Sequence, residues 1–232
     1  MAGIAVGASI GGVAAAALGG IIIYANLPTK YTIGKHELPT YSYLGETTLK
    51  PFTKDGNLQG NQIKAAELFK KSPHLVMAVR RPGCLLCRRE AAALSTLLPL
   101  LQEKGIQLVA VVHETKGVPE FQPWFKGDVY FDEEVKSHNL GIFRDENLQK
   151  RFYGPKQRWM PIWLGFLRVG TYMNVYKAKK EGANGNMEGE GRLLGGLFFV
   201  ANNNIPYAHL EKEWGDAADI DEVRQAIEKY KL

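Results

Sequence analysis

Two cysteines between a strand-like and a helix-like segment constrain the fold of this chain most. Cys84 and Cys87, the two cysteines among 232 residues, stand in a C-x-x-C spacing directly after a Pro-Gly pair. Residues 75–79 before them are continuously apolar, which is typical of a central parallel strand buried on both faces. Residues 89–104 after them repeat apolar side chains at helical spacing. A strand, a tight turn and a helix around two thiols indicate a candidate redox pair.

A second apolar run at residues 106–112 predicts another buried strand. We expect Pro99 to interrupt the helix between the two strands, and Gly105 to follow its end. Strand, helix and strand then form a right-handed βαβ unit. The thiols would lie at the carboxyl end of a parallel strand, where open α/β sheets carry their sites.

The remaining segments complete an α/β domain over residues 61–232, with a central mixed sheet and flanking helices. Residues 28–60 are interpreted as a linker with a short β element, in which residues 41–44 and 47–52 alternate apolar and polar side chains. The further predicted elements are a helix at 62–71, a short helix at 119–126, a strand at 128–131, a charged loop with short helices at 132–157, a hairpin of 193–201 and 205–210, and a C-terminal helix beginning at Asp219.

The thiol chemistry assigns a role to each cysteine. A thiolate is the reactive form of cysteine, and the first turn of a helix stabilises an anion. Cys84 should feel this effect most and is the predicted nucleophile at an exposed mouth of the turn, whereas Cys87, one turn further, is the predicted resolving thiol. The arginines expected to stabilise the thiolate are Arg80, Arg81 and Arg88.

Two other interpretations of the cysteine pair compete with a redox role. A structural zinc site needs about four ligands, and the five histidines show no paired spacing, which disfavours a metal. An inert buried pair is disfavoured by the arginines around it. Pro82 and Gly83 are expected to leave backbone space for a substrate. Arg192, ahead of the predicted hairpin, is expected either to face the thiolate or to lie in solvent.

Residues 3–25 contain no charged side chain, and at about 1.5 Å per residue they would cover a hydrocarbon core of about 30 Å. We therefore expect residues 1–27 to form a helical membrane anchor. Small residues recur every four positions, a pattern that favours self-association of such helices into a homo-oligomer. Lys30 and Lys35 favour a cytoplasmic main domain. A cleaved signal peptide, a mitochondrial presequence and an apolar tail docked on protein are the alternatives.

An aromatic run at residues 159–176 is bounded by basic residues on both sides. It is interpreted either as a helix covering the sheet or as a basic aromatic helix at a membrane interface. The net charge of +5 suits anionic partners or a membrane surface, and the sequence contains no nucleic-acid-binding motif.

Separate segments resemble the peroxiredoxin-like 2 family within the thioredoxin-like superfamily. They read MAVRRPGCLLCR at 77–88, FQPWFKG at 121–127, RFYGP at 151–155, and NMEGEG at 186–191 with LGG at 194–196. The resemblance implies a thioredoxin-like fold and an antioxidant or redox-regulatory enzyme with Cys84 and Cys87 as its redox centre. It also implies no bound cofactor and a partner that is an external thiol reductant such as thioredoxin or glutathione.

Two further functions remain as alternatives at this point. A relative with prostaglandin F synthase activity makes reduction of an endoperoxide an alternative reaction, which would need an apolar pocket beside Cys84. A membrane-bound interaction protein with thiols that do not cycle is the alternative from another class.

Overall fold

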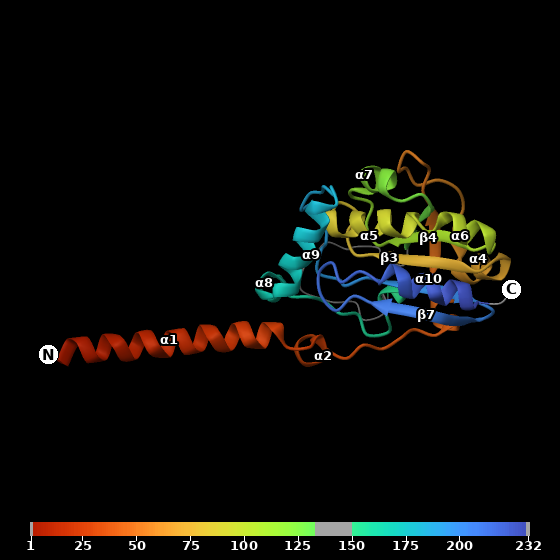
Figure 1. Ribbon diagram of the computed structural model, residues 1–232. Helices are drawn as coiled ribbons and strands as arrows, with labels where there is room; N and C mark the ends of the chain where they lie inside the picture. Colours follow the sequence, from red (N-terminus) through yellow and green to blue (C-terminus); the bar gives the residue numbers. More distant parts are fainter. Residues whose placement is uncertain (1, 133–149, 231–232) are drawn as a thin grey trace.

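The computed structural model describes residues 2–132 and 150–230 (Figure 1). Within these residues one seven-stranded sheet forms the centre of the molecule, in the order β2-β1-β5-β4-β3-β6-β7. Its strands are β1 (Thr48–Pro51), β2 (Ile63–Lys64), β3 (His74–Val79), β4 (Gln107–Val112), β5 (Asp128–Asp132), β6 (Gly196–Ala201) and β7 (Asn204–Leu210).

The predicted βαβ unit is present. β3 pairs in parallel with β4 with Met77 opposite Ala110, and β4 pairs in parallel with β5. β6 pairs with β3 in the antiparallel direction, so the sheet is mixed. Every residue of β3 is buried, as its continuous apolar sequence predicts for a central strand. The thioredoxin-like α/β fold expected from the sequence is therefore confirmed.

Successive residues of β3 point to opposite faces of the sheet, and each face has its own core. Leu75 and Met77 join the core beneath α5 (Leu85–Ser95), α6 (Leu98–Glu103) and α10 (Ile220–Lys229). Val76 and Ala78 join the core beneath α3 (Tyr41–Gly45), α4 (Ala65–Lys71) and η2 (Arg151–Tyr153). α7 (Val118–Phe121) and η1 (Gln122–Trp124) lie on the α5 side, where Phe121 packs into the first core.

The breaks in the helix after the thiols follow the sequence closely. α5 ends at Ser95, and α6 carries Pro99 in its first turn, where the missing N–H of proline costs nothing. Gly105 follows with a φ of +62°, a backbone conformation that glycine adopts without strain. Asn202 and Asn203 adopt positive φ at the predicted hairpin turn, and Asp219 caps α10 by accepting from the N–H of Asp221.

Residues 41–44 form a helix and not the expected β element. The Oγ1 of Thr40 accepts a hydrogen bond from the N–H of Tyr43, which is an N-cap arrangement that competes with strand formation. The other part of the expected β element, β1, joins the central sheet by pairing with β5. The segment interpreted as a linker thus contributes a strand to the domain. Most of the charged segment expected as a loop, 133–149, lies outside the described residues.

The aromatic run divides at Arg168 into two helices, α8 (Ile162–Leu167) and α9 (Val169–Lys180). Arg168 itself is extended and buried. Its Nε lies 2.6 Å from Oε2 of Glu213, and its Nη1 donates to the carbonyl of Ala25 at 2.9 Å. This arginine therefore joins the two helices to the chain segment that precedes the domain.

That preceding segment begins with α1 (Ala2–Asn26), which projects from the domain as a separate rod, followed by α2 (Thr29–Thr32) (Figure 1). Asn26 fixes its end, because its side chain donates to the carbonyl of Leu167 and accepts from the N–H of Val169. Over the residues that the structure describes, no helix combines the length and apolar character needed to cross a bilayer. The anchoring and self-association expected of α1 stay predictions.

Candidate functional site

Cys84 occupies the N-cap position of α5, and Cys87 follows within the first turn of this helix. The carbonyl of Cys84 accepts the first helical hydrogen bond, from the N–H of Arg88 at 3.0 Å. Both cysteines are free thiols, and each residue is only 2 % exposed. The exposed position expected for Cys84 is therefore wrong. Gly185, in the loop after α9, packs so closely on Leu85 and Gly83 that it covers the start of the helix.

Arg80 is the main charged partner of the thiols. It follows β3 directly, is 2 % exposed, and places Nη2 3.2 Å from the Sγ of Cys84. Its Nη1 donates to the carbonyl of Gly191 at 3.1 Å, and its Nε lies 3.5 Å from Oε2 of Glu211. These contacts with Gly191, which precedes β6, and Glu211, which follows β7, fix the position of the guanidinium beside the sulfur of Cys84.

These contacts separate the two thiols in acidity. The pKa of Cys84 is lowered well below the usual value, first by a hydrogen bond from the Cys87 thiol and then by the charges of Arg80 and Arg81, which together outweigh burial. The pKa of Cys87 is raised well above the usual value by the same hydrogen bond and by burial. At neutral pH the arrangement favours a thiolate at Cys84 and a protonated thiol at Cys87.

Two buried carboxyl groups lie behind the thiols, and sequence reasoning missed both. Glu211 follows the end of β7, and its Oε2 also accepts the N–H of Gly195 at 2.7 Å. Burial raises its pKa. Glu90 lies on α5, where its Oε1 accepts from the N–H of Ala218 at 3.4 Å. Burial, followed by the charge of Glu211, raises the pKa of Glu90 to about 7. A charged residue at an inward position of an apolar helix stripe was the available signal for Glu90.

A buried histidine supports the backbone of Arg80. The Nε2 of His113 lies 2.8 Å from the carbonyl oxygen of Arg80, and its Nδ1 lies 3.1 Å from Nζ of Lys150. Burial and then the charge of Lys150 lower the pKa of His113 to about 3, so the imidazole is neutral. A neutral ring that donates from Nε2 and accepts at Nδ1 fits both contacts.

The other predicted arginines lie in different surroundings. Arg81 donates to the carbonyl of Met187 at 3.0 Å and contributes charge near Cys84. Arg88 binds the loop after α9, because its Nη1 donates to the side chain of Asn184 at 3.1 Å. Arg192 forms an exposed pair with Glu190 at 2.7 Å. Of the two positions expected for Arg192, this exposed pair agrees with the one in solvent.

Pro82 and Gly83 serve packing in this structure. The carbonyl of Pro82 accepts from Nε of Arg88 at 3.2 Å. A Cβ at Gly83 would overlap the side chain of Asn186, so the space expected for a substrate is filled by that residue. The backbone N–H of Asn186 also donates to the carbonyl of Gly83 at 2.8 Å.

A cavity of about 440 Å³ opens beside Cys84. Its charged groups come from Arg80, Arg81, Arg192 and Glu190. Its apolar walls come from α5, α8, α9 and the chain after β7: Leu85, Leu86, Ile162, Phe166, Val175 and Trp214. The Cys84 thiol in the lining and the apolar walls around it suit a substrate with an apolar body.

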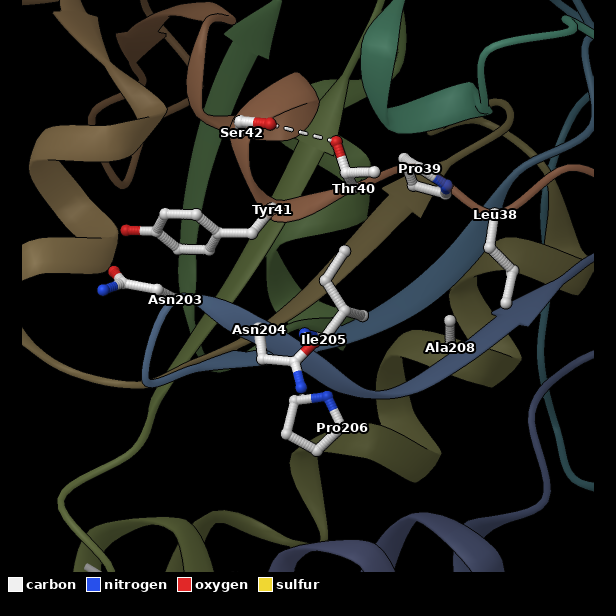
Figure 2. Close-up of a pocket in the computed structure, with 10 residues that line it drawn as sticks. All are labelled: Leu38, Pro39, Thr40, Tyr41, Ser42, Asn203, Asn204, Ile205, Pro206 and Ala208. Atoms are coloured by element: carbon white, nitrogen blue, oxygen red, sulfur yellow. Dashed lines mark hydrogen bonds between the residues drawn. The ribbon is translucent and has the colours of Figure 1, made fainter.

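A second hollow lies between residues 38–42 and the start of β7 (Figure 2). Its lining includes Leu38, Tyr41, Ile205 and Pro206, and the hydroxyls of Thr40 and Ser42 lie 3.1 Å apart. It has no charged side chain and no thiol among its lining residues. The chemistry-bearing residues therefore gather in the cavity at Cys84.

Comparisons with known proteins place this sequence in a family. The model of the family described as AhpC/TSA antioxidant enzyme matches residues 93–213, a stretch that begins after the cysteine pair. Peroxiredoxin-like 2A of Mus musculus is 39 % identical over 227 residues, which cover 96 % of this chain and 93 % of that protein. Peroxiredoxin-like 2A of Homo sapiens is 38 % identical over 227 residues, 96 % of this chain and 90 % of that protein.

Among solved structures, the crystal structure of peroxidoxin BcpB from Mycobacterium tuberculosis is similar, with a TM-score of 0.47 and 12 % identity, over 84 % of this chain and all of that one. The relatives match nearly the whole of this chain and of their own length. Membership of this family indicates a thiol-dependent redox function. This chain therefore belongs to the peroxiredoxin-like 2 family, within the AhpC/TSA antioxidant enzymes.

Proposed function

We propose that this protein is a thiol-dependent peroxide reductase in which Cys84 is the nucleophile and Cys87 the resolving thiol. The observation that carries the proposal is the contact of 3.2 Å between Arg80 Nη2 and Cys84 Sγ at the start of α5. A buried guanidinium and a helix N-terminus both favour the thiolate. Cys87 donates to that thiolate and lies one turn away, which suits a thiol that closes a disulfide afterwards.

The proposed cycle balances in three steps. The Cys84 thiolate attacks one oxygen of the peroxide R–O–O–H, the O–O bond breaks, and the leaving alkoxide takes a proton to become an alcohol. Cys84 is then a sulfenic acid, oxidised by two electrons. The Cys87 sulfur attacks the Cys84 sulfur, water leaves with the thiol proton, and a disulfide forms. An external thiol reductant, thioredoxin or glutathione, returns two electrons and two protons.

A peroxide-consumption assay with each reductant tests the cycle. Cys84→Ser should abolish turnover, whereas Cys87→Ser should consume about one equivalent of peroxide and accumulate a sulfenic acid that dimedone captures at Cys84. Full turnover by Cys84→Ser, or capture at position 87 in the native chain, would contradict the assignment. A reducing compartment such as the cytoplasm suits the cycle, because both thiols must return to the free state.

Reduction of an endoperoxide is a second candidate reaction, supported by the apolar cavity at Cys84. In this reaction the thiols of Cys84 and Cys87 give two electrons and two protons to the O–O bond of a cyclic peroxide, as a prostaglandin F synthase requires. The peroxide becomes two hydroxyl groups, the cysteines form a disulfide, and the external thiol reductant restores them. We propose Arg192 at the cavity rim as a contact for the substrate in either reaction. Parallel assays with hydrogen peroxide and an apolar endoperoxide separate the two candidates.

The non-enzymatic alternative predicts thiols that do not cycle. Counting free thiols before peroxide, after peroxide and after added reductant decides between this alternative and a redox enzyme. A redox enzyme loses two thiols and regains them, whereas an interaction protein with inert cysteines keeps two throughout.

A further inference from the structure

α8 and α9 carry a broad apolar surface that no part of the described chain covers. Trp163 is 51 % exposed, Met173 56 % and Tyr176 69 %. Val169 and Tyr172 continue this surface along the same side of α9, at spacings of three and four residues. We call these five residues, together with Ile162 and Phe166 of α8, the α8–α9 face. Single exposed apolar residues are common, but a contiguous patch of this size marks an interaction site.

The opposite side of the two helices is fixed against the domain, so this face cannot turn inward. A Cβ at Gly165 would overlap the ring of Trp214, and one at Gly170 would overlap Glu213. The ion pair of Arg168 with Glu213 holds the junction between the helices. The hydroxyl of Tyr172 donates to the carbonyl of Phe166 at 2.7 Å, which ties α9 to α8.

The α8–α9 face continues into α1, and this continuity points to lipid as its occupant. The end of α1 is joined to α8 and α9 through the hydrogen bonds of Asn26 with Leu167 and Val169. Along α1, Val13, Leu18 and Ile23 are each more than 60 % exposed. The sequence of α1 contains no charged residue, so the apolar surface extends beyond α8 and α9 along a second element, a length that a lipid surface can cover.

The charges around the face suit anionic lipid headgroups. Residues 162–180 contain no aspartate or glutamate, and α9 ends in Lys177, Lys179 and Lys180, all exposed. Basic residues beside an apolar, aromatic surface are typical of segments that lie at a membrane interface.

The cavity at Cys84 opens at this same face. Ile162 is 56 % exposed and Phe166 46 % exposed, and both also line the cavity. A molecule that leaves the α8–α9 face along these two side chains would enter a space that Cys84 also lines. We propose that the α8–α9 face rests on an anionic lipid surface, so that the cavity receives apolar hydroperoxides directly from the bilayer.

The choice of substrate rests on the proposed peroxide reduction. A lipid hydroperoxide R–O–O–H would give up its distal oxygen to the Cys84 thiolate and leave as the alcohol R–O–H after taking a proton. Cys84 becomes a sulfenic acid, and Cys87 and an external thiol complete the cycle as above. The apolar body R remains among the apolar walls of the cavity during the step.

Tryptophan fluorescence of the full chain tests the surface without reference to activity. The chain has four tryptophans, and vesicles of phosphatidylserine and bromine-labelled phosphatidylcholine should quench the one at the lipid surface. Trp163→Phe should lose most of the quenching, whereas Trp124→Phe, on η1, should retain it. Salt should weaken binding. The proposal would be overturned if the vesicles quenched Trp163→Phe as strongly as the native chain. It would also be overturned if self-association buried Trp163 in the absence of lipid.

Activity against two peroxides tests the delivery. Met173→Glu should slow reduction of a phosphatidylcholine hydroperoxide in anionic vesicles about tenfold, because it puts a charge on the face. Its activity on hydrogen peroxide in water should not change. Leu38→Glu, an exposed apolar residue in the hollow of Figure 2, is the matched control and should behave as the native chain. Unchanged activity of Met173→Glu on the vesicle substrate would overturn delivery from the bilayer.

The two proposals fail in different ways. A native chain that reduces neither peroxide would refute the proposed function, and the quenching result would still decide whether the α8–α9 face binds lipid. A native chain that reduces hydrogen peroxide but shows no quenching at Trp163 would refute the lipid surface alone.

Discussion

Arg80 Nη2 lies 3.2 Å from Cys84 Sγ, and both residues are only 2 % exposed. A guanidinium and a sulfur are thus removed from water together at the carboxyl end of β3. Glu211 balances the charge of Arg80 from the other side, at 3.5 Å. Since a buried ionic group needs partners, the three side chains form one unit, in which the proposed thiolate at Cys84 would provide a second negative charge.

The first prediction concerns this unit. Arg80→Gln should slow alkylation of Cys84 by iodoacetamide at pH 7 by about tenfold or more, because the charge that favours the thiolate is lost. The pH at which the alkylation rate is half-maximal should rise. Arg89→Gln is the control, since Arg89 forms an exposed pair with Glu181. An unchanged pH profile in Arg80→Gln would show that the hydrogen bond from Cys87 and the remaining groups lower the pKa of Cys84 without Arg80.

A second prediction concerns Glu90 and pH. The carboxyl group of Glu90 has a pKa of about 7 in the folded chain, against a usual value of 4.5. Because the folded-state pKa is raised, its stabilising contribution is complete below pH 4.5 and is lost as pH rises towards 7. The loss is about 3 kcal/mol at most. Glu90→Gln should therefore reduce the fall in unfolding free energy between pH 5 and pH 8.

Denaturant unfolding at the two pH values measures this difference. Glu228→Gln on the exposed side of α10 is the control and should leave the pH dependence unchanged. If the unfolding free energy of Glu90→Gln fell as much between pH 5 and pH 8 as that of the native chain, the pH dependence would belong to other groups. Glu211, whose pKa burial also raises, would be the first of them.

Much of the fold could be predicted because its signals are local. Each signal lies within the residues that form the element. They are the continuous apolar runs of β3 and β4, Pro99 in the first turn of α6, and the two asparagines of the hairpin turn. The alternation of residues 41–44 predicts a strand, but the hydroxyl of Thr40 caps a helix there instead.

The site was predicted less completely, because its groups meet only in the folded chain. Cys84 and Arg80 were identified from their proximity in sequence. Glu211 lies more than a hundred residues from either, and nothing in its neighbourhood indicates that hairpin pairing brings it beside Arg80. The burial of Cys84 depends on the loop after α9, whose Gly185 packs against the start of α5. Such long-range contacts have no local pattern.

A third prediction concerns the link between the two parallel strands. The hydroxyl of Tyr153 donates to the carbonyl of Val79 at 2.8 Å and also lies 3.3 Å from the carbonyl of Val111, at the carboxyl ends of β3 and β4. Tyr153→Phe leaves buried carbonyl oxygens without this donor and should cost about 1–2 kcal/mol of unfolding free energy. Tyr176→Phe, at an exposed position, should cost nothing measurable by the same denaturant titration.

The last prediction concerns Gly83 and Asn186, which hold the covering loop on the thiol turn. A Cβ at Gly83 would overlap the Asn186 side chain, so Gly83→Ala should cost about 1–3 kcal/mol of unfolding free energy through overpacking. Asn186→Ala removes the overlapping atoms and keeps the backbone hydrogen bond of 2.8 Å to the carbonyl of Gly83. The double variant should therefore be less destabilised than the sum of the two single variants.

Alkylation of Cys84 supplies the functional readout for the same four proteins. Gly83→Ala should speed the reaction with iodoacetamide, because the displaced loop no longer covers the sulfur, and the double variant should return towards the native rate. If the two substitutions were strictly additive in both stability and alkylation rate, Gly83 and Asn186 would not be coupled. The covering of Cys84 would then have to rest on the contact of Gly185 with the start of α5.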